Sequence, residues 1–304
     1  MTNRVPYLTQ ARRPLTHAVE AMNEHGVHGQ IAIPTERALT IYVDKREIVT
    51  LMTLGARPEL LVLGYLRNQR LIASADEIES ITVDWELADA STDSKDASLS
   101  LTDAGVAAVK TRHGIARIEE RTARRVVTTG CGQGSIFGGL MDDVQAIALP
   151  EARITQSQLY AIVNTIRLQD STYKAAGSVH GCALFSGDQR LFFVEDVGRH
   201  NAIDTIAGWM ALQDEATAQG GDKVFYTTGR LTSEMVIKSA QMGVPIVVSR
   251  SGITQMGHAV AQQLGLCTIG RATNKRFLCF SAPWRLELEP HLVAPGPVTA
   301  AALV

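Results

Sequence analysis

The pattern of apolar and polar positions changes about halfway along the chain. From about residue 150 onwards, short apolar runs typical of buried strands alternate with segments whose apolar residues recur at helical spacing. Strands and helices that alternate through short connections predict a largely parallel sheet with helices on both faces. The expected strands are 191–194, 224–227, 245–248 and 267–269, and the expected helices begin near Thr155, Ile203, Thr232 and Gln255.

The first half of the chain has a different pattern, in which stretches typical of strands lie on both sides of a helical segment. Residues 38–43 and 47–52 flank the turn-forming pair Asp44 and Lys45, which predicts two short strands joined by a turn. A helix is expected to follow, because Pro58 suits a first helical turn, and residues 78–85 predict another strand. This half is therefore interpreted as a mixed α+β module.

Together these patterns predict an α/β protein with two domains. We expect a smaller N-terminal α+β domain over residues 21–127 and a C-terminal α/β domain over residues 141–287. A glycine-rich loop, 128–140, is expected to join them. The polar residues 1–20 and the small, Pro-containing residues 288–304 are expected to form a flexible arm and a flexible tail.

Composition narrows the classes of function. The chain has 304 residues with 29 Lys+Arg against 31 Asp+Glu, and this balance argues against a broad basic surface for nucleic acid. No apolar run reaches the roughly 18–20 residues that span a bilayer, and no secretory signal opens the chain. The cysteines are scattered without a zinc pattern or other metal-binding spacing, as in a reducing cytosol. We expect a soluble cytoplasmic protein.

Cys131 lies in the glycine-rich segment 128–139, shortly after Arg124 and Arg125. Glycines permit close backbone approach and a mobile loop, where a cysteine has little use for core packing. The neighbouring arginines favour the thiolate, which is the reactive form of the side chain. The alternative interpretation is an incidental thiol on a linker. Cys182, Cys267 and Cys279 have apolar neighbours and are expected to be buried, inert thiols.

Two further loops leave an expected strand through a glycine and enter a helix. The first carries Gly198, Arg199, His200, Asn201 and Asp204, a polar set that suits an anion or a polar ring at a helix N-terminus. In the alternative interpretation, Asn201 is only an N-cap and Asp204 only a first-turn acid.

The second loop has the same arrangement, in which a glycine leads from a strand to polar residues at a helix start: Gly229, Arg230 and Ser233. Glu234 and Lys238 follow as i,i+4 partners, which need be no more than a surface ion pair. A basic loop after the last expected strand offers further cations, or is a solvated turn. Its residues are Arg271, Ala272, Thr273, Asn274, Lys275 and Arg276.

His180 lies in a small-residue segment and is expected to be either structural or functional.

These blocks together resemble the formate dehydrogenase accessory sulfurtransferases, the FdhD family. The resemblance extends in order over roughly residues 35–285. The blocks that carry it are 52–66, 176–184, 197–204, 229–238 and 243–248.

The resemblance implies a specific activity. Family members take persulfide sulfur from a cysteine desulfurase and pass it to the molybdenum or tungsten bis-molybdopterin guanine dinucleotide cofactor of formate dehydrogenase. They typically act as homodimers, with a carrier cysteine in a Cys-x-x-Cys loop. Cys131 matches the first cysteine of that loop, whereas Gly134 replaces the second.

The resemblance also implies a fold and a cofactor site. The C-terminal half would be a three-layer α/β/α domain resembling the cytidine-deaminase fold without its zinc. The segment 271–276 matches the one through which the family contacts the cofactor. Arg199, Arg230, Arg271, Lys275 and Arg276 are expected to serve its phosphates, with Gly198, His200, Asn201, Asp204, Gly229, Ser233 and His180 beside them.

Two rival functions stay open at this point. With Gly134 in the loop, the chain can be a homologue that binds, chaperones or inserts the cofactor without transferring sulfur. A cysteine hydrolase using Cys131 and His180 is the second rival, but the sequence shows no orienting acid for it.

Overall fold

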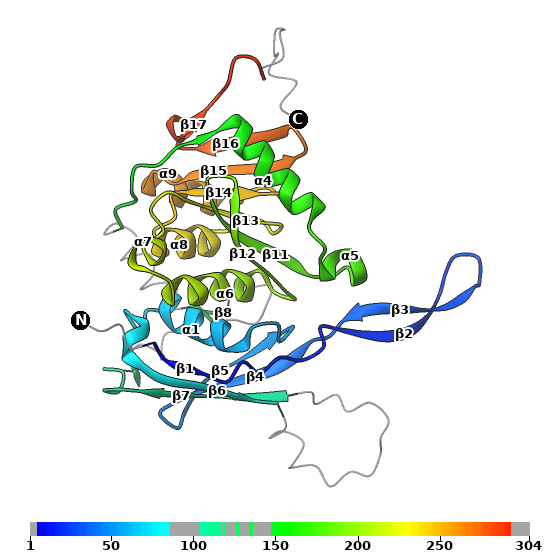
Figure 1. Cartoon of the computed structure of the whole chain (residues 1–304), viewed down its shortest axis with the longest axis vertical. Helices are drawn as coiled ribbons and strands as arrows, with labels where there is room; N and C mark the ends of the chain where they lie inside the picture. The colour runs from blue at the N-terminus through cyan, green and yellow to red at the C-terminus, as the bar shows by residue number, and fades with distance from the viewer. Residues whose placement is uncertain are drawn as a thin grey trace. The chain divides into compact units, whose positions relative to one another are not determined.

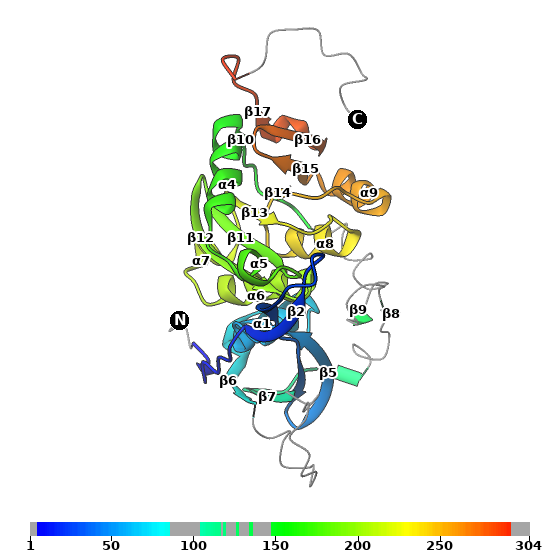
Figure 2. The same ribbon diagram turned by 90° about the vertical axis from the view of Figure 1, so that its right-hand side faces the viewer.

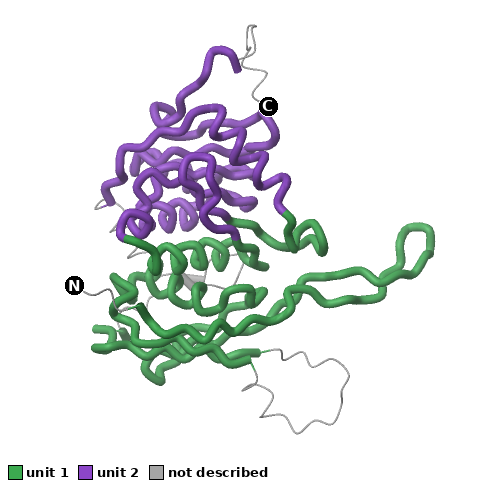
Figure 3. The backbone as a smooth tube through the Cα atoms, viewed as in Figure 1, with its two compact units in different colours: residues 1–141, 170–182, 194–214 green, residues 142–169, 183–193, 215–304 purple. Residues whose placement is uncertain are grey.

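The computed structural model describes residues 5–85, 104–116, 118–119, 126–127, 134–135 and 147–292. The chain divides into two compact units (Figure 3). Unit 1 comprises residues 1–141, 170–182 and 194–214, and unit 2 comprises residues 142–169, 183–193 and 215–304. This division differs from the expected one, because two segments of the C-terminal half belong to unit 1.

Unit 1 contains a mixed five-stranded sheet (Figure 1). The expected hairpin is confirmed, and its turn residues Asp44 and Lys45 have φ values of 48° and 72°, the left-handed backbone of a tight hairpin turn. The expected strand at 78–85 is confirmed as β6. In order across the sheet, the strands are β1 (Tyr7–Leu8), β6 (Ile78–Asp84), β7 (Ala104–Thr111), β4 (Arg37–Val43) and β5 (Arg46–Thr53).

Residues 5–20 differ from the expected flexible arm. Tyr7 and Leu8 form β1, which pairs in parallel with β6. The next strand, β2 (Thr16–Met22), pairs with β3 (His28–Pro34) in an antiparallel ribbon. Polar composition misleads here, because strand pairing uses backbone groups, which every residue except proline carries in full.

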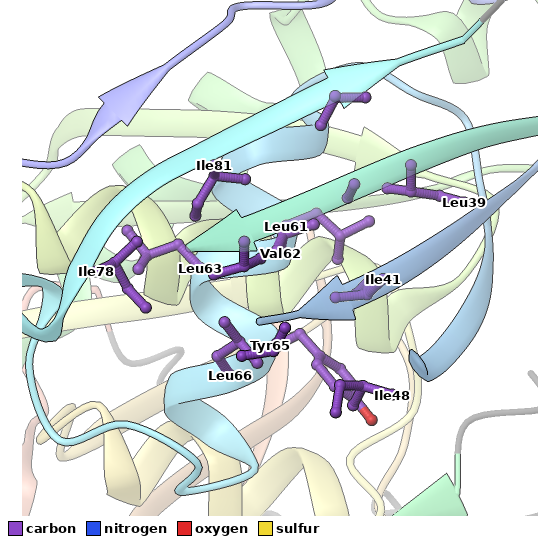
Figure 4. Packing of buried hydrophobic residues seen from close by; sticks show 14 of the residues in the cluster. Leu39, Ile41, Ile48, Leu61, Val62, Leu63, Tyr65, Leu66, Ile78 and Ile81 are labelled. Carbon is purple, nitrogen blue, oxygen red and sulfur yellow. The ribbon is translucent and has the colours of Figure 1, made fainter. Parts of the chain in front are cut away.

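Two helices of unit 1, α1 (Pro58–Asn68) and α6 (Arg199–Ala211), cross at backbone contact. A Cβ atom at Gly64 would lie 1.6 Å from the carbonyl oxygen of Asp204, and one at Gly208 would lie 1.9 Å from that of Leu60. Leu61, Val62 and other side chains of α1 pack toward the sheet strands in the hydrophobic core (Figure 4). The two glycines therefore bring α6 against α1 as part of unit 1.

Most of unit 2 is built on a six-stranded sheet, whose strands β11 and β12 pass from one unit into the other. The strands β13, β14 and β15 are parallel, and β16 is antiparallel to β15. In order across the sheet, the strands are β12 (Gln189–Asp196), β11 (His180–Ser186), β13 (Lys223–Thr227), β14 (Ile246–Ser249), β15 (Cys267–Thr273) and β16 (Arg276–Ser281).

Helices cover this sheet, with α4 on one side and α8 and α9 on the other (Figure 2). The expected helix start near Thr155 is confirmed at α4, which opens with a capping box in which Thr155 accepts from the backbone N–H of Gln158. The longer helices are α4 (Gln156–Leu168), α8 (Ser233–Gln241) and α9 (Gln255–Leu264). The shorter elements of the chain are α5 (Thr172–Ala176), α7 (Glu215–Ala218), β10 (Ile154–Thr155) and β17 (Leu286–Glu287).

The predicted α/β class is confirmed at the level of a mixed α/β protein with several sheets. Among the described residues, no helix is long and apolar enough to cross a membrane. The expected tail is described only as far as residue 292, and residues 293–304 lie outside the described part.

Candidate functional site

Three neighbouring parallel strands of unit 2 end at the same edge of the sheet. Thr227 at the end of β13 lies opposite Ser249 at the end of β14, and β15 runs parallel beside them. Each strand carries an exposed arginine at or just after this edge: Arg230, Arg250 and Arg271. Ligands of open α/β sheets bind at the carboxyl ends of such strands, so this edge is the candidate site for an anionic ligand.

Backbone hydrogen bonds hold the three arginine-bearing segments together. Ser249 adds a side-chain bond, because its Oγ donates to the carbonyl oxygen of Gly229 at 2.7 Å. Segments tied in this way present their cations at fixed backbone positions. The backbone bonds run from Arg250 N to Thr227 O (3.0 Å), from Leu231 N to Gly252 O (2.9 Å) and from Arg271 N to Ser251 O (2.7 Å).

The expected basic loop at residues 271–276 is wrong, since this segment is a β-hairpin. Arg271 lies inside β15 at an irregularity in the pairing with β16, and its φ of 51° is left-handed. Asn274 and Lys275 form the turn, with a φ of 52° at Asn274, and Arg276 opens β16. The sequence conceals this hairpin because a bulge interrupts the strand pattern. Within the segment Ala272 is buried, and the other members are exposed.

The turn of this hairpin borders a cavity of about 400 Å³ whose other wall is α4. Tyr160, Asn164 and Arg167 line it from the helix, and Asn274 and Lys275 line it from the turn. The Tyr160 hydroxyl donates to the carbonyl oxygen of Lys275 at 3.2 Å and so joins the two walls. The sequence prediction missed the helix residues, although their i, i+4 and i+7 spacing marks one polar face.

The N-terminus of α8 lies at the same sheet edge as Arg230. Thr232 occupies the N-cap position, yet its Oγ1 atom is buried and bonds to none of the described residues. Ser233 is buried in the first turn. The alternative of a surface pair at Glu234 and Lys238 is wrong: both side chains are buried, and Lys238 Nζ lies 3.6 Å from Glu234 Oε1. This ion pair forms part of the interior beneath the edge.

The N-terminus of α6, in unit 1, already holds a carboxylate of the chain. Asp196 is buried, and its oxygens accept from Gly198 N at 3.3 Å and Asn201 Nδ2 at 2.9 Å. They also accept from Thr53 Oγ1 at 2.6 Å and from Leu54 N at 3.3 Å. Burial raises the pKa of Asp196 to about 6, although all four hydrogen bonds act in the opposite direction.

Asp196 was missed by the sequence prediction, which assigned this helix start to an external anion. Its position two residues after the apolar run 191–194 was the available signal. The alternative that Asn201 caps the helix is also wrong, since Gly198 is the N-cap. Asn201 instead ties the helix to β5 by donating to the carbonyl oxygen of Met52 at 2.6 Å.

The remaining predicted residues of this segment are buried in unit 1. Arg199 and His200 have exposed fractions of 6% and 4%, and Asp204 has 0%. The Asn68 amide donates to Asp204 Oδ1 at 2.7 Å, linking α1 and α6. His180, also in unit 1, opens β11 and is half-buried. The predicted residues thus belong to two sets, a buried one in unit 1 and a largely exposed one in unit 2.

The predicted carrier Cys131 lies outside the described residues. Its flanks are described: β8 (Val126–Val127) and β9 (Gly134–Ser135) pair antiparallel, with Val127 opposite Gly134. Gly134, which the sequence resemblance placed at the position of a second loop cysteine, belongs to the strand β9.

Comparison with known proteins decides the family. The FdhD/NarQ family model matches residues 34–287. The chain belongs to the FdhD/NarQ family. This confirms the resemblance inferred from the sequence blocks, and the matched range contains Cys131, the sheet edge of unit 2 and the start of α6.

Curated FdhD relatives are similar over most of their length. The "Sulfur carrier protein FdhD" of Bacillus subtilis (strain 168) is 28% identical over 254 residues, covering 83% of this chain and 89% of that protein. The protein of the same name from Bacillus licheniformis is 30% identical over an equal length and share.

A solved structure shares the fold of this FdhD/NarQ chain. The protein comes from Desulfotalea psychrophila and is provisionally described as a formate dehydrogenase accessory protein. It aligns with a TM-score of 0.66 at 23% identity and covers 90% of this chain and 100% of its own. The agreement over both chains supports the arrangement of strands and helices described above.

Proposed function

We propose that this chain is a sulfur carrier in the activation of formate dehydrogenase. In this function Cys131 accepts sulfur from the persulfide of a cysteine desulfurase and delivers it to the molybdenum or tungsten bis-molybdopterin guanine dinucleotide cofactor, which is a substrate here. The observation that carries the proposal is the family match over residues 34–287, whose curated relatives are named sulfur carrier proteins.

The transfer needs only one nucleophilic sulfur on this chain. The Cys131 thiolate attacks the outer sulfur of the donor persulfide, the donor S–S bond breaks, and the donor cysteine leaves as a thiolate. Cys131 then holds a persulfide, and its outer sulfur passes to the cofactor while Cys131 returns to a thiolate. Gly134 leaves this sequence of bonds intact, because a resolving thiol takes no part in it.

The sheet edge of unit 2 supports recognition of the cofactor's guanosine diphosphate ends. Arg230, Arg250 and Arg271 are exposed there, and guanidinium groups form strong bidentate hydrogen bonds with phosphate oxygens. The neighbouring cavity offers the amide side chains of Asn164 and Asn274, which match the donors and acceptors of a purine edge. We assign phosphate binding to the arginines and place the base in this cavity.

The proposal includes the setting expected from the family resemblance. The carrier acts in the cytoplasm as a homodimer, receives sulfur from a cysteine desulfurase and serves the catalytic subunit of formate dehydrogenase. The resemblance of its C-terminal half to the cytidine-deaminase fold stays a prediction.

The test replaces the carrier sulfur and leaves the fold intact. In cells whose own homologue has been deleted, Cys131→Ala is expected to abolish formate dehydrogenase activity. Purified wild type incubated with desulfurase and cysteine should gain one sulfur atom on Cys131 by mass spectrometry. Cys182→Ser is the control, because Cys182 is buried in β11 and should affect stability before transfer.

The same experiment separates the sulfur carrier from its rival. Full formate dehydrogenase activity with Cys131→Ala would contradict sulfur transfer through this residue and favour a homologue that only binds or inserts the cofactor. The replacement of the second loop cysteine by Gly134 is the observation that keeps this rival in view.

A further inference from the structure

Two cysteines outside the proposed carrier loop lie on adjacent strands of unit 2. Cys267 begins β15, and Cys279 lies in the antiparallel neighbour β16, opposite Ile269. Cys267 precedes Ile269 by two positions and therefore points to the same face of the sheet as Ile269 and Cys279. Cys267 belongs to the hydrophobic cluster of buried residues on that face, and the partly buried Cys279 packs against it. The fold thus brings together two thiols that take no part in the proposed sulfur transfer.

The two thiols differ in exposure. Cys267 has an exposed fraction of 0%, whereas Cys279 is only half-buried, so the expectation that Cys279 is buried is wrong. Both are free cysteines in the structure. An accessible thiol with a buried thiol beside it gives a small reagent one point of entry and supplies a second sulfur to complete a reaction.

Hydrogen bonding gives the pair a direction. The Cys267 thiol bonds to the sulfur of Cys279, which lowers the pKa of Cys279, while the same bond and burial raise the pKa of Cys267. The Arg285 guanidinium adds a favourable positive charge near Cys267. Arg285 is held in place by donating from Nε to the carbonyl oxygen of Gly265 at 2.9 Å. The Cys279 thiol donates to the carbonyl oxygen of Ser281 at 3.5 Å. Because Cys279 is the more exposed thiol and its pKa is lowered, it is the nucleophile once deprotonated, and Cys267 is the second thiol.

We propose that Cys267 and Cys279 form a dithiol that hydroperoxides oxidise to a disulfide between β15 and β16. The Cys279 thiolate attacks one peroxide oxygen, the O–O bond breaks, and Cys279 becomes a sulfenic acid as an alcohol or water leaves. Cys267 then attacks the Cys279 sulfur, the S–O bond breaks, and water departs with the proton of the Cys267 thiol. The peroxide is reduced by two electrons, and both come from the two sulfurs.

The disulfide would close a covalent ring around the hairpin. Residues 267–279 contain Arg271, the turn at Asn274 and Lys275, and the start of β16, so oxidation would staple the two strands that carry the exposed cations. A cross-link of this kind restricts separation of the strands. This inference goes beyond the proposed sulfur transfer and does not depend on it, since neither step involves Cys131.

The experiment uses the full chain with Cys131→Ser, so that carrier chemistry does not contribute. The protein is treated with hydrogen peroxide, quenched, unfolded and alkylated with a maleimide, and the peptides are mapped by mass spectrometry. Cys267 and Cys279 are expected to lose alkylation together and to appear as one linked peptide pair that dithiothreitol separates. Cys182, buried in the same sheet, is expected to keep its alkylation and is the internal control.

Single variants assign the order of the steps. With Cys279→Ser, peroxide should leave Cys267 fully alkylatable, because the accessible nucleophile is gone. With Cys267→Ser, Cys279 should be trapped by dimedone as a sulfenic acid, and the linked pair should be absent. Alkylation of both thiols after peroxide treatment, or conversion of Cys279 to a sulfinic acid while Cys267 stays alkylatable, would overturn the proposal. The chain with both thiols intact decides this even if Cys267→Ser fails to fold.

Discussion

The two glycine–arginine junctions of the chain look alike in sequence and differ in structure. In unit 1, β12 leads through Gly198 and Arg199 into α6, and in unit 2, β13 leads through Gly229 and Arg230 toward α8. In each, the glycine N–H donates to the last residue of the strand, to Asp196 at 3.3 Å or to Thr227 Oγ1 at 3.1 Å. The acceptor is a carboxylate in unit 1 and a neutral hydroxyl in unit 2.

That single difference changes what each junction can bind. The α6 junction contains its own anion, and Arg199 beside it is buried. The β13 junction contains no carboxylate at the equivalent position, and Arg230 is exposed. A helix start is an anion site only while its donors are not already served from within the chain. The last residue of the preceding strand therefore distinguishes a junction whose donors are served by the chain itself from the one at which we propose that the ligand binds.

The largest effect is expected from Asp196→Ala. The substitution leaves Thr53, Leu54, Gly198 and Asn201 donating into an apolar space, and unsatisfied buried donors cost roughly 1–3 kcal/mol each. We expect a loss of roughly 3–5 kcal/mol in the free energy of unfolding, measured by urea denaturation. Arg230→Ala is the control and should lie within about 0.5 kcal/mol of wild type, since its side chain is exposed. Equal stability of the two variants would break the comparison.

The pH dependence of stability tests the charge of Asp196. Its pKa rises from the ordinary 3.8 to about 6 on folding, so between these values the folded chain binds more protons than the unfolded one. Stability should therefore fall as pH rises from about 4 to about 6, by about 3 kcal/mol in total, and level off above that range. Asp196→Asn cannot titrate and should lack this component.

The measurement for this prediction is the difference in unfolding free energy between wild type and Asp196→Asn along a pH series. Other titrating groups are common to both proteins and cancel in the difference. A constant difference between pH 4 and pH 6 would contradict the assignment.

Guanosine diphosphate binding should depend on Arg230 and not on Arg199. A charge-assisted hydrogen bond to phosphate contributes enough that Arg230→Ala should weaken binding about tenfold in calorimetry. The effect should shrink as salt is added, because exposed charges are screened. Arg199→Ala should lower the melting temperature and leave the affinity of the remaining folded protein near that of wild type. A lower affinity for guanosine diphosphate in Arg199→Ala than in Arg230→Ala would show that the α6 junction binds the ligand.

The smallest expected effect concerns two threonines at helix starts of unit 2. Thr254 caps α9 by accepting from Gly257 N at 3.2 Å, whereas Thr232 at α8 makes no such bond among the described residues. Thr254→Ala should cost about 1 kcal/mol of unfolding free energy. Thr232→Ala should cost less than about 0.5 kcal/mol, because it removes a buried hydroxyl without a partner. Urea denaturation of both variants measures the two losses, and equal losses of unfolding free energy would contradict this difference between the caps.

The sequence predicted elements best where local signals agreed. A helix was expected to begin near Gln255, and α9 is found at Gln255–Leu264, where a capping threonine, an apolar stripe and a closing glycine coincide. Strand β7 was not predicted, since its alanines, glycine and lysine are residue types that are depleted in strands. The ribbon of β2 and β3 was hidden by similarly mixed composition.

The site was predicted less completely because its decisive contacts join distant parts of the chain. Arg230 and Arg271 were recognised from glycines beside them, but Arg250 has no such marker and only the parallel register places it at the same edge. Asp196 was missed because its partners Thr53 and Leu54 lie more than a hundred residues earlier. Such pairings follow from topology, which a local pattern does not contain.

The contact of Gly64 with α6 also constrains the order in which the protein can assemble on the ribosome. The strands β4 to β7 and helix α1 are synthesised first, but the helix that covers α1 ends at Ala211. During translation of the intervening residues, α1 has no α6 against its glycine, and the nascent chain exposes that surface. Unit 1 therefore completes its packing only after the first two segments of unit 2, residues 142–169 and 183–193, have been made, and a product that terminates near residue 141 would present an unfinished core to chaperones and proteases.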